Sequence, residues 1–183
     1  MPTESTRMSW RRSPGTWMAG ALLLVTVGYL VAASPPSPRW HAEYRVGGSV
    51  IAADELVLDH RHPMRPPGDE DVEGPFAAEW ETCLEMPTAG TVAFLLTSSG
   101  RARLYVDGAM VIDDWDSHSL GSQGTKHALE AGRHLVRVAY EAPPTRAAIT
   151  LAASFGREPP TDLPAERLSL PGDAPNTRCA PGP

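Results

Sequence analysis

A group of acidic residues around a tryptophan is the part of this chain whose residue types best fit ligand chemistry. The four residues are Asp113, Asp114, Trp115 and Asp116. Carboxylates accept hydrogen bonds from hydroxyl groups, and an indole ring packs on the apolar face of a pyranose. The alternative is that Trp115 closes the end of a β-fold core while solvent covers the acids. Both interpretations place these residues in a loop that follows a β-hairpin.

Two other groups contain residue types that are common in active sites, but the sequence around them does not match a known catalytic motif. Ser117 and His118 follow Asp116, but neighbouring residues rarely form a hydrolytic triad, and no Gly-x-Ser-x-Gly turn is present. The acidic stretch 69–73 lies among prolines and glycines, which is typical of a solvated loop. We therefore expect no catalytic residue, and a protein that is not an enzyme.

A metal site is also not expected. His60 and His62 would share one face of a strand, but Zn²⁺ needs three or four ligands. No second cluster of histidine and cysteine supplies the remainder, and Arg61 and Arg65 disfavour a bound cation.

The elements that must position these residues are β-strands. Residues 76–86 alternate between an apolar and a polar face, which predicts a strand with one buried side. Asp107-Gly108 between two strand-like runs predicts a type I′ hairpin turn. Further strands are predicted at 43–46, 55–58, 91–97, 126–130, 134–141 and 147–155. The fold class is therefore all-β, an antiparallel barrel or sandwich.

The first 33 residues are predicted to form a segment separate from the folded domain. Residues 1–15 are a basic N-terminal region, and 16–33 form an uncharged apolar run that fits either a transmembrane helix or a signal peptide. Either way, positive residues stay on the cytoplasmic side and the rest of the chain is exported. A proline-rich spacer at 34–39, a domain at 40–157 and a proline-rich tail at 158–183 complete the organisation. We expect the domain to face the periplasm or cell surface, or to be secreted if the leader is cleaved.

The charge and the cysteine content limit the classes of binding partner and indicate the redox state of the compartment. The formal net charge is −6 and Lys126 is the single lysine, so we do not expect the clustered basic residues that nucleic acid binding requires. Cys83 and Cys179 are the only cysteines, and an oxidising compartment allows them to form a disulfide. Two unpaired thiols are the alternative.

The order and spacing of the motifs along the chain resemble those of the PA14 domain family, which is named after the protective antigen of a bacterial toxin. The resemblance covers roughly residues 40–155. It is carried by residues 76–81, Pro87-Thr88-Ala89-Gly90, the run 103–108, the run 111–115, Leu129 to His134 and Val136 to Tyr140. It implies a β-barrel binding module, found in glycosidases, adhesins and toxins and often binding carbohydrate.

The sequence departs from this family at the metal site. In adhesin members, two adjacent aspartates hold a calcium ion that the sugar hydroxyls also coordinate. Ser99 and Gly100 stand in that place here, preceded by Ser98 and followed by Arg101. Neutral positions supply little of the charge that Ca²⁺ requires. The resemblance thus implies a degenerate calcium site and no cofactor.

The sequence therefore predicts a non-catalytic extracytoplasmic binding module with a glycan as first-choice ligand. The candidate ligand-binding residues are Ser98, Ser99, Asp113, Asp114, Trp115 and Asp116. The alternative is a structural or protein-interaction module of a membrane or envelope complex.

Overall fold

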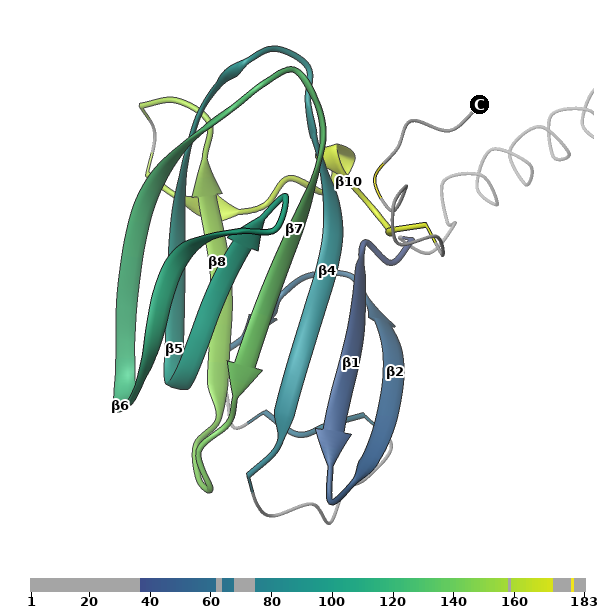
Figure 1. Cartoon of the computed structure of the whole chain (residues 1–183), viewed down its shortest axis with the longest axis vertical. Coiled ribbons are helices and arrows are strands. Elements are labelled where there is room, and N and C mark those ends of the chain that lie inside the picture. Colours follow the sequence, from purple (N-terminus) through teal and green to yellow (C-terminus); the bar gives the residue numbers. More distant parts are fainter. Residues whose placement is uncertain (1–36, 62–63, 68–74, 158, 173–178, 180–183) are drawn as a thin grey trace, which may run out of the picture. The chain divides into compact units, whose positions relative to one another are not determined.

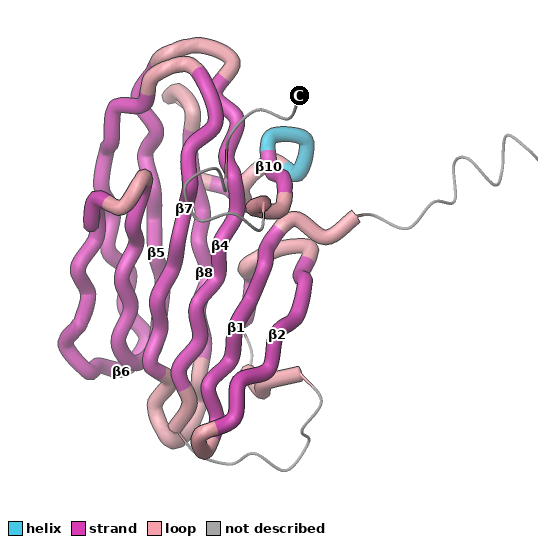
Figure 2. Tube along the Cα trace, turned by 45° about the vertical axis from the view of Figure 1, so that its right-hand side comes forward, coloured by secondary structure: helices cyan, strands magenta, loops and turns pink. Residues whose placement is uncertain are grey.

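A computed structural model describes residues 37–61, 64–67, 75–157, 159–172 and 179. The elements are β1 (Trp40–Val46), β2 (Ser49–Glu55), β3 (Asp59–His60), β4 (Ala77–Met86), β5 (Gly90–Val106), β6 (Ala109–Leu129), β7 (Gly132–Glu141), β8 (Ala148–Ser154), β9 (Thr161–Asp162), the 3₁₀ turn η1 (Ala165–Arg167) and β10 (Leu168–Ser169). Every ladder between these strands is antiparallel. The predicted all-β antiparallel class is confirmed (Figures 1 and 2).

The strands form one curled sheet. Its main path runs β2-β1-β4-β7-β5-β8-β3, with β6 paired to β5 beside it. Among the described residues no ladder joins β2 to β3, so the sheet forms a half-barrel. The closed barrel that the sequence analysis allowed is therefore not what these strands build.

The curl arises in the long strand β5. Its first half pairs with β8 over Ala93 to Ser99, and its second half pairs with β7 over Arg101 to Val106. Between them lies Gly100, with a φ of 97° and register shifts on both sides. Strand β6 pairs with both halves, so the β5–β6 hairpin contributes to both parts of the sheet (Figure 1).

The apolar face predicted for residues 76–86 forms the core. Trp80 and Leu84 are completely buried, and Phe76, Ala78 and Met86 are at most 6% exposed. Trp80 lies edge-on to Tyr44, with ring centroids 5.7 Å apart, and 6.2 Å from Tyr140. Burial of such rings contributes about 1.5–3 kcal/mol each, so this register is strongly specified.

Several predicted boundaries are wrong. The strand expected at 55–58 is β2, which ends at Glu55, and the short strand expected at 126–130 is the end of β6. The loop expected at 113–116 also lies within β6. Turn-forming residues in the sequence suggested shorter strands, but the β5–β6 hairpin continues through them because each new pair extends the ladder from the one before.

The C-terminal segment holds more structure than its prolines suggested. Strand β9 pairs with β8, and β10 pairs with β4 through Ser169 and Cys83. This cover buries Cys83 and Glu81, which the alternation had placed on the solvent side. Cys83 and Cys179 form a disulfide, one of the two alternatives left open by the sequence.

No helix in the described part of the chain has the length and apolar character needed to cross a membrane. The apolar run 16–33 lies outside the described residues, as do His62 and the acidic stretch 69–73.

Candidate functional site

The hairpin turn that begins the candidate site forms as predicted. Asp107 and Gly108 both have positive φ, 50° and 81°, and Val106 pairs with Ala109. The Asp107 carboxylate accepts hydrogen bonds from the Leu135 amide at 2.9 Å and from His134 Nδ1 at 2.6 Å. The turn is thus fastened to β7.

His134 itself lies between two acceptors, because its Nε2 is 3.0 Å from the carbonyl oxygen of Glu130. Only the protonated ring donates from both nitrogens. Burial alone lowers the pKa of His134, but the hydrogen bonds to Asp107 and Glu130 outweigh it and raise the pKa above its ordinary value.

Beyond the turn, a β-bulge decides which side chains face outward. Tyr105 pairs with Met110, but Leu104 pairs with Ile112, so one extra residue is inserted in β6. Arg103 therefore lies opposite Asp113, and Ala102 opposite Asp114. We call the side of β1, β4, β5 and β7 away from the core the outer face.

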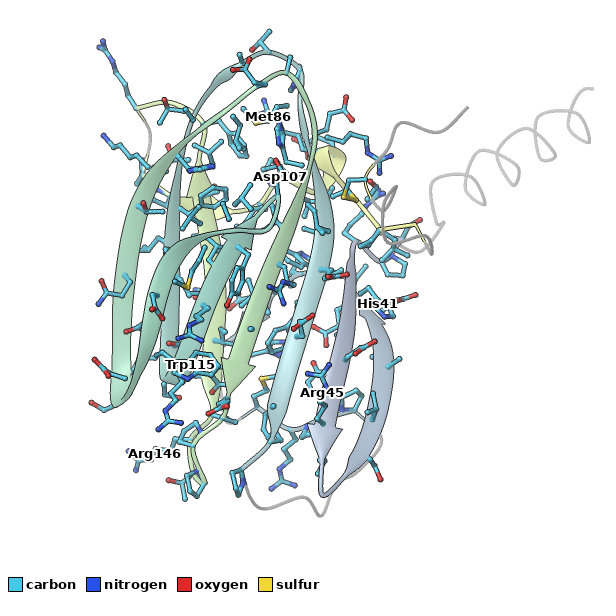
Figure 3. All side chains as sticks on the ribbon, in the orientation of Figure 1. His41, Arg45, Met86, Asp107, Trp115 and Arg146 are labelled. Carbon is cyan, nitrogen blue, oxygen red and sulfur yellow. A yellow bond between two sulfur atoms is a disulfide. The ribbon has the colours of Figure 1, made fainter. Side chains whose placement is uncertain are left out.

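On the outer face, Asp113 and Trp115 lie beside Arg103. The Arg103 Nε donates to Asp113 Oδ1 at 2.7 Å, and its guanidinium carbon lies 4.2 Å from the centroid of the Trp115 ring. Asp113 is about half exposed, and Trp115 is partly exposed. A cation over the ring face stabilises the indole in place. Figure 3 shows Trp115 and Arg146 in the lower half of the view and Asp107 in the upper half.

Asp114 points the other way, into the fold. It is 6% exposed, and Ser98 Oγ donates to its Oδ2 at 3.5 Å. The structure thus brings Ser98 and Asp114 together and separates Asp114 from Asp113 and Trp115. Asp116 is exposed. The six candidate residues therefore do not form one cluster.

Ser99 is used within the fold. Its hydroxyl donates to the Arg146 carbonyl at 2.7 Å and accepts from the Ala148 amide at 3.0 Å, and its own carbonyl accepts from Tyr140 Oη at 2.7 Å. Burial raises the pKa of the Tyr140 phenol. These bonds hold the loop between β7 and β8 against the bend of β5.

Gly100, at the other position of the degenerate acidic pair, is fixed by sterics. A Cβ atom there would lie 2.5 Å from the Glu141 carbonyl oxygen and 2.8 Å from Pro143 Cδ. Positions 99 and 100 therefore present no carboxylate and little room. Among the described residues, no group of three metal-type ligands gathers.

Three residues of these contacts, Arg103, Arg146 and Tyr140, were not among the residues predicted from the sequence. Arg103 was within reach, because it faces the acidic segment across a hairpin whose turn was recognised. The other two carry no local signal, since their role depends on how β7 and β8 meet the bend of β5. His60, considered for a metal, instead lies 3.0 Å from Glu55 Oε2.

Comparison with known proteins agrees with this architecture. The family model described as the PA14 domain matches residues 62–158, more than half of the chain. The chain therefore belongs to the PA14 domain family, as its motifs predicted. No curated protein matches it.

Solved structures share the fold at low identity. An anti-sigma factor domain-containing protein matches with a TM-score of 0.66 and 21% identity, covering 76% of this chain and 50% of its own length. The PA14 domain of the MpAFP antifreeze protein has a TM-score of 0.60 and 12% identity, covering 75% and 94%. A PA14 sugar-binding domain from an RTX adhesin has a TM-score of 0.53 and 14% identity, covering 72% and 98%. This chain thus spans only half of the first of these proteins.

Proposed function

We propose that this protein is a non-catalytic, extracytoplasmic binding module whose ligand is a glycan. The observation that carries the proposal is the group of Arg103, Asp113 and Trp115 on the outer face. It joins a partly exposed indole to a hydrogen-bonding ion pair, the combination that recognises the apolar and hydroxyl sides of a sugar. The adhesin sugar-binding domain with the same fold supports this class of ligand.

Binding at this group is proposed to be independent of calcium. Ser99 and Gly100 offer no carboxylate where adhesins of the resemblance carry two, and the Ser99 hydroxyl is already bonded to Arg146 and Ala148. A neutral, internally satisfied position gives a divalent cation neither charge nor free oxygen ligands.

We also propose that residues 16–33 deliver the domain across the membrane and tether it, with 40–157 as the binding domain and 34–39 as spacer. The Cys83–Cys179 disulfide supports an oxidising compartment, because cytosolic thiols are kept reduced. Protease treatment of spheroplasts, which exposes both periplasmic and cell-surface domains, tests the location. A domain that stays protected until the cytoplasmic membrane is lysed would contradict it.

A glycan array probed with the full chain in detergent, followed by calorimetry with and without calcium, tests the ligand. Trp115→Ala should lower affinity for any glycan that binds by about tenfold, since a stacked aromatic contributes about 1.5 kcal/mol. Phe155→Ala is the matched control. Phe155 carries the Arg167 guanidinium 4.4 Å from its ring, outside the proposed group. Absence of binding to every glycan would reject the proposal.

A protein-interaction module of an envelope complex is the second candidate. The degenerate acidic pair favours it, and so does the fold shared with an anti-sigma factor domain-containing protein. Cross-linking in membranes followed by purification should then give a stoichiometric protein partner. A lone chain with Trp115-dependent glycan affinity would contradict this candidate.

A further inference from the structure

Exposed apolar side chains gather at one place on this domain. Among the described residues, six large apolar side chains are more than a third exposed, and three of these lie close together. Leu56 and Val57 directly follow β2 and are 44% and 47% exposed, and Leu170 directly follows β10 and is 36% exposed. We call these three residues the apolar collar. Single exposed apolar residues are normal, but a group of them marks a surface that contacts an apolar partner.

Hydrogen bonds place the collar beside the first described residues of the chain. The Arg39 amide donates to the carbonyl oxygen of Glu55, the last residue before the collar, at 2.8 Å. The Thr82 hydroxyl is shared between the carbonyl oxygens of Arg39, at 2.8 Å, and Ser169, at 3.3 Å. Figures 1 and 2 show the start of β1, the end of β2 and β10 on the same side of the sheet. Residues 37–39 therefore lie beside both parts of the collar.

The organisation of the chain indicates what this surface meets. Residues 37–39 are the end of the proline-rich spacer 34–39, which follows the apolar run 16–33. Even fully extended, such a spacer spans no more than about 25 Å. With the apolar run in the membrane, the start of β1 stays within this distance of the bilayer. This step rests on the tether of the proposed function.

Acidic side chains beside the collar have partners in the fold. Asp54, which lines a groove together with part of the collar, lies 3.0 Å from His41 Nδ1. Asp162, which lines a small pocket together with another part, lies 3.6 Å from Arg61 Nη2. Such partnered charges are less costly to bring to a membrane interface than isolated ones.

From this arrangement we infer that the apolar collar docks the domain on the lipid surface. Leu56, Val57 and Leu170 then lie at the boundary between headgroups and acyl chains, the depth that the apolar face of an interfacial segment reaches. Three side chains bind a membrane weakly by themselves. The tether makes the contact intramolecular, and the high effective concentration of lipid compensates for the small contact.

Docking through the collar leaves the glycan group open to solvent. In the sheet, β1 is separated from β6 by β4, β7 and β5. Neighbouring strands are about 4.8 Å apart, so β6 lies about 20 Å along the sheet from β1. Trp115 therefore faces away from the lipid that the collar contacts.

A fluorescent probe on the collar tests the inference in the full chain. The two native cysteines are bonded to each other, so a maleimide dye labels only an introduced cysteine. Val57→Cys carries an environment-sensitive dye, in phosphatidylcholine nanodiscs that hold one chain each. Its emission should shift to shorter wavelength and be quenched by doxyl-labelled lipid. A zwitterionic lipid is used because apolar docking needs no anionic headgroup, and the chain is itself acidic.

Val50→Cys is the matched control. Val50 is also an exposed valine, at 61%, but it lies at the other end of β2. Its dye should be neither shifted nor quenched. The double change Leu56→Ser with Leu170→Ser should abolish quenching at position 57. Because both side chains are exposed and outside the Trp115 group, the thermal unfolding temperature and the glycan affinity should stay unchanged.

Equal quenching at positions 57 and 50, or full quenching in the double variant, would overturn the inference. So would a wavelength shift at position 57 without quenching by lipid, because protein would then cover the collar. Co-migration with the nanodiscs separates docking from the tether. A chain that co-migrates with an unquenched dye at position 57 contradicts docking alone, and a chain that does not enter the discs contradicts the tether and the docking together.

Discussion

Two polar clusters, one partly buried and one buried, fasten irregular segments to the sheet, and they use opposite chemistry. In the first, Glu55 accepts hydrogen bonds from the Tyr44 hydroxyl, from Trp80 Nε1 at 3.2 Å and from His60 Nε2 at 3.0 Å. We call it the carboxylate cluster. It holds the segment that carries β3 against β1 and β4.

The second, which we call the hydroxyl cluster, consists of Ser99, Tyr140 and the backbone of the loop between β7 and β8. Tyr140 Oη accepts from the Ala148 amide at 3.1 Å, besides donating to Ser99. This cluster contains no charged side chain. The comparison indicates that a charged and a neutral network achieve the same attachment, but only the charged one links attachment to pH.

The largest effect is expected at the bend beside the hydroxyl cluster. Gly100→Ala should lower the free energy of unfolding by more than about 3 kcal/mol, because the added Cβ meets backbone at a positive φ. Urea denaturation measures this. Gly90→Ala is the control, because its Cβ would have only Met86 Cε at 4.0 Å. Equal stability of both variants would show that the bend relaxes freely.

The carboxylate cluster should come next. Glu55→Gln keeps the shape but places an amide donor among three donors, and should lower the free energy of unfolding by about 2–3 kcal/mol. The same change at the exposed Glu85 of β4 is the control and should lie within about 0.5 kcal/mol of the unmodified protein. A neutral result at Glu55 would remove the distinction between the clusters.

Ser99→Ala should have a smaller effect, about 1–2 kcal/mol. It removes the bonds to Arg146 and Ala148, but the Ala148 amide keeps Tyr140 as an acceptor. Ser122→Ala removes an exposed hydroxyl pair with Thr97 and should change little. If both variants unfolded alike, Ser99 would not hold the loop.

The smallest effect is the pH dependence. Burial alone would raise the pKa of Glu55, but the hydrogen bonds from His60 and Tyr44 outweigh it, so the folded pKa lies below the ordinary value. The resulting stabilisation is complete above the ordinary glutamate pKa of about 4.3 and is lost as pH falls through the folded pKa. As pH falls through this window, the free energies of unfolding of the unmodified protein and of Glu55→Gln should converge. Ser99→Ala should stay parallel to the unmodified protein; a parallel Glu55→Gln curve would contradict the assignment.

Much of the sheet follows from local pattern. The apolar face of residues 76–86 and the Asp107-Gly108 turn were predicted correctly, because alternation and positive φ act over a few residues. The burial of Cys83 was missed, because it depends on a segment nearly a hundred residues away. The candidate site was predicted only in part. Trp115 and the acidic residues were identified from the sequence, but Arg103 and the inward direction of Asp114 were not.

The sequence by itself determined most of the strands, the turn and the family, since these depend on side-chain periodicity and on a few residues with special backbone freedom. Only the tertiary structure decided the bulge between Leu104 and Tyr105. Strict alternation of faces from the turn onward would place Asp113 and Trp115 on the inner face and Asp114 on the outer face. One inserted residue exchanges the faces, because neighbouring side chains on a strand point to opposite sides.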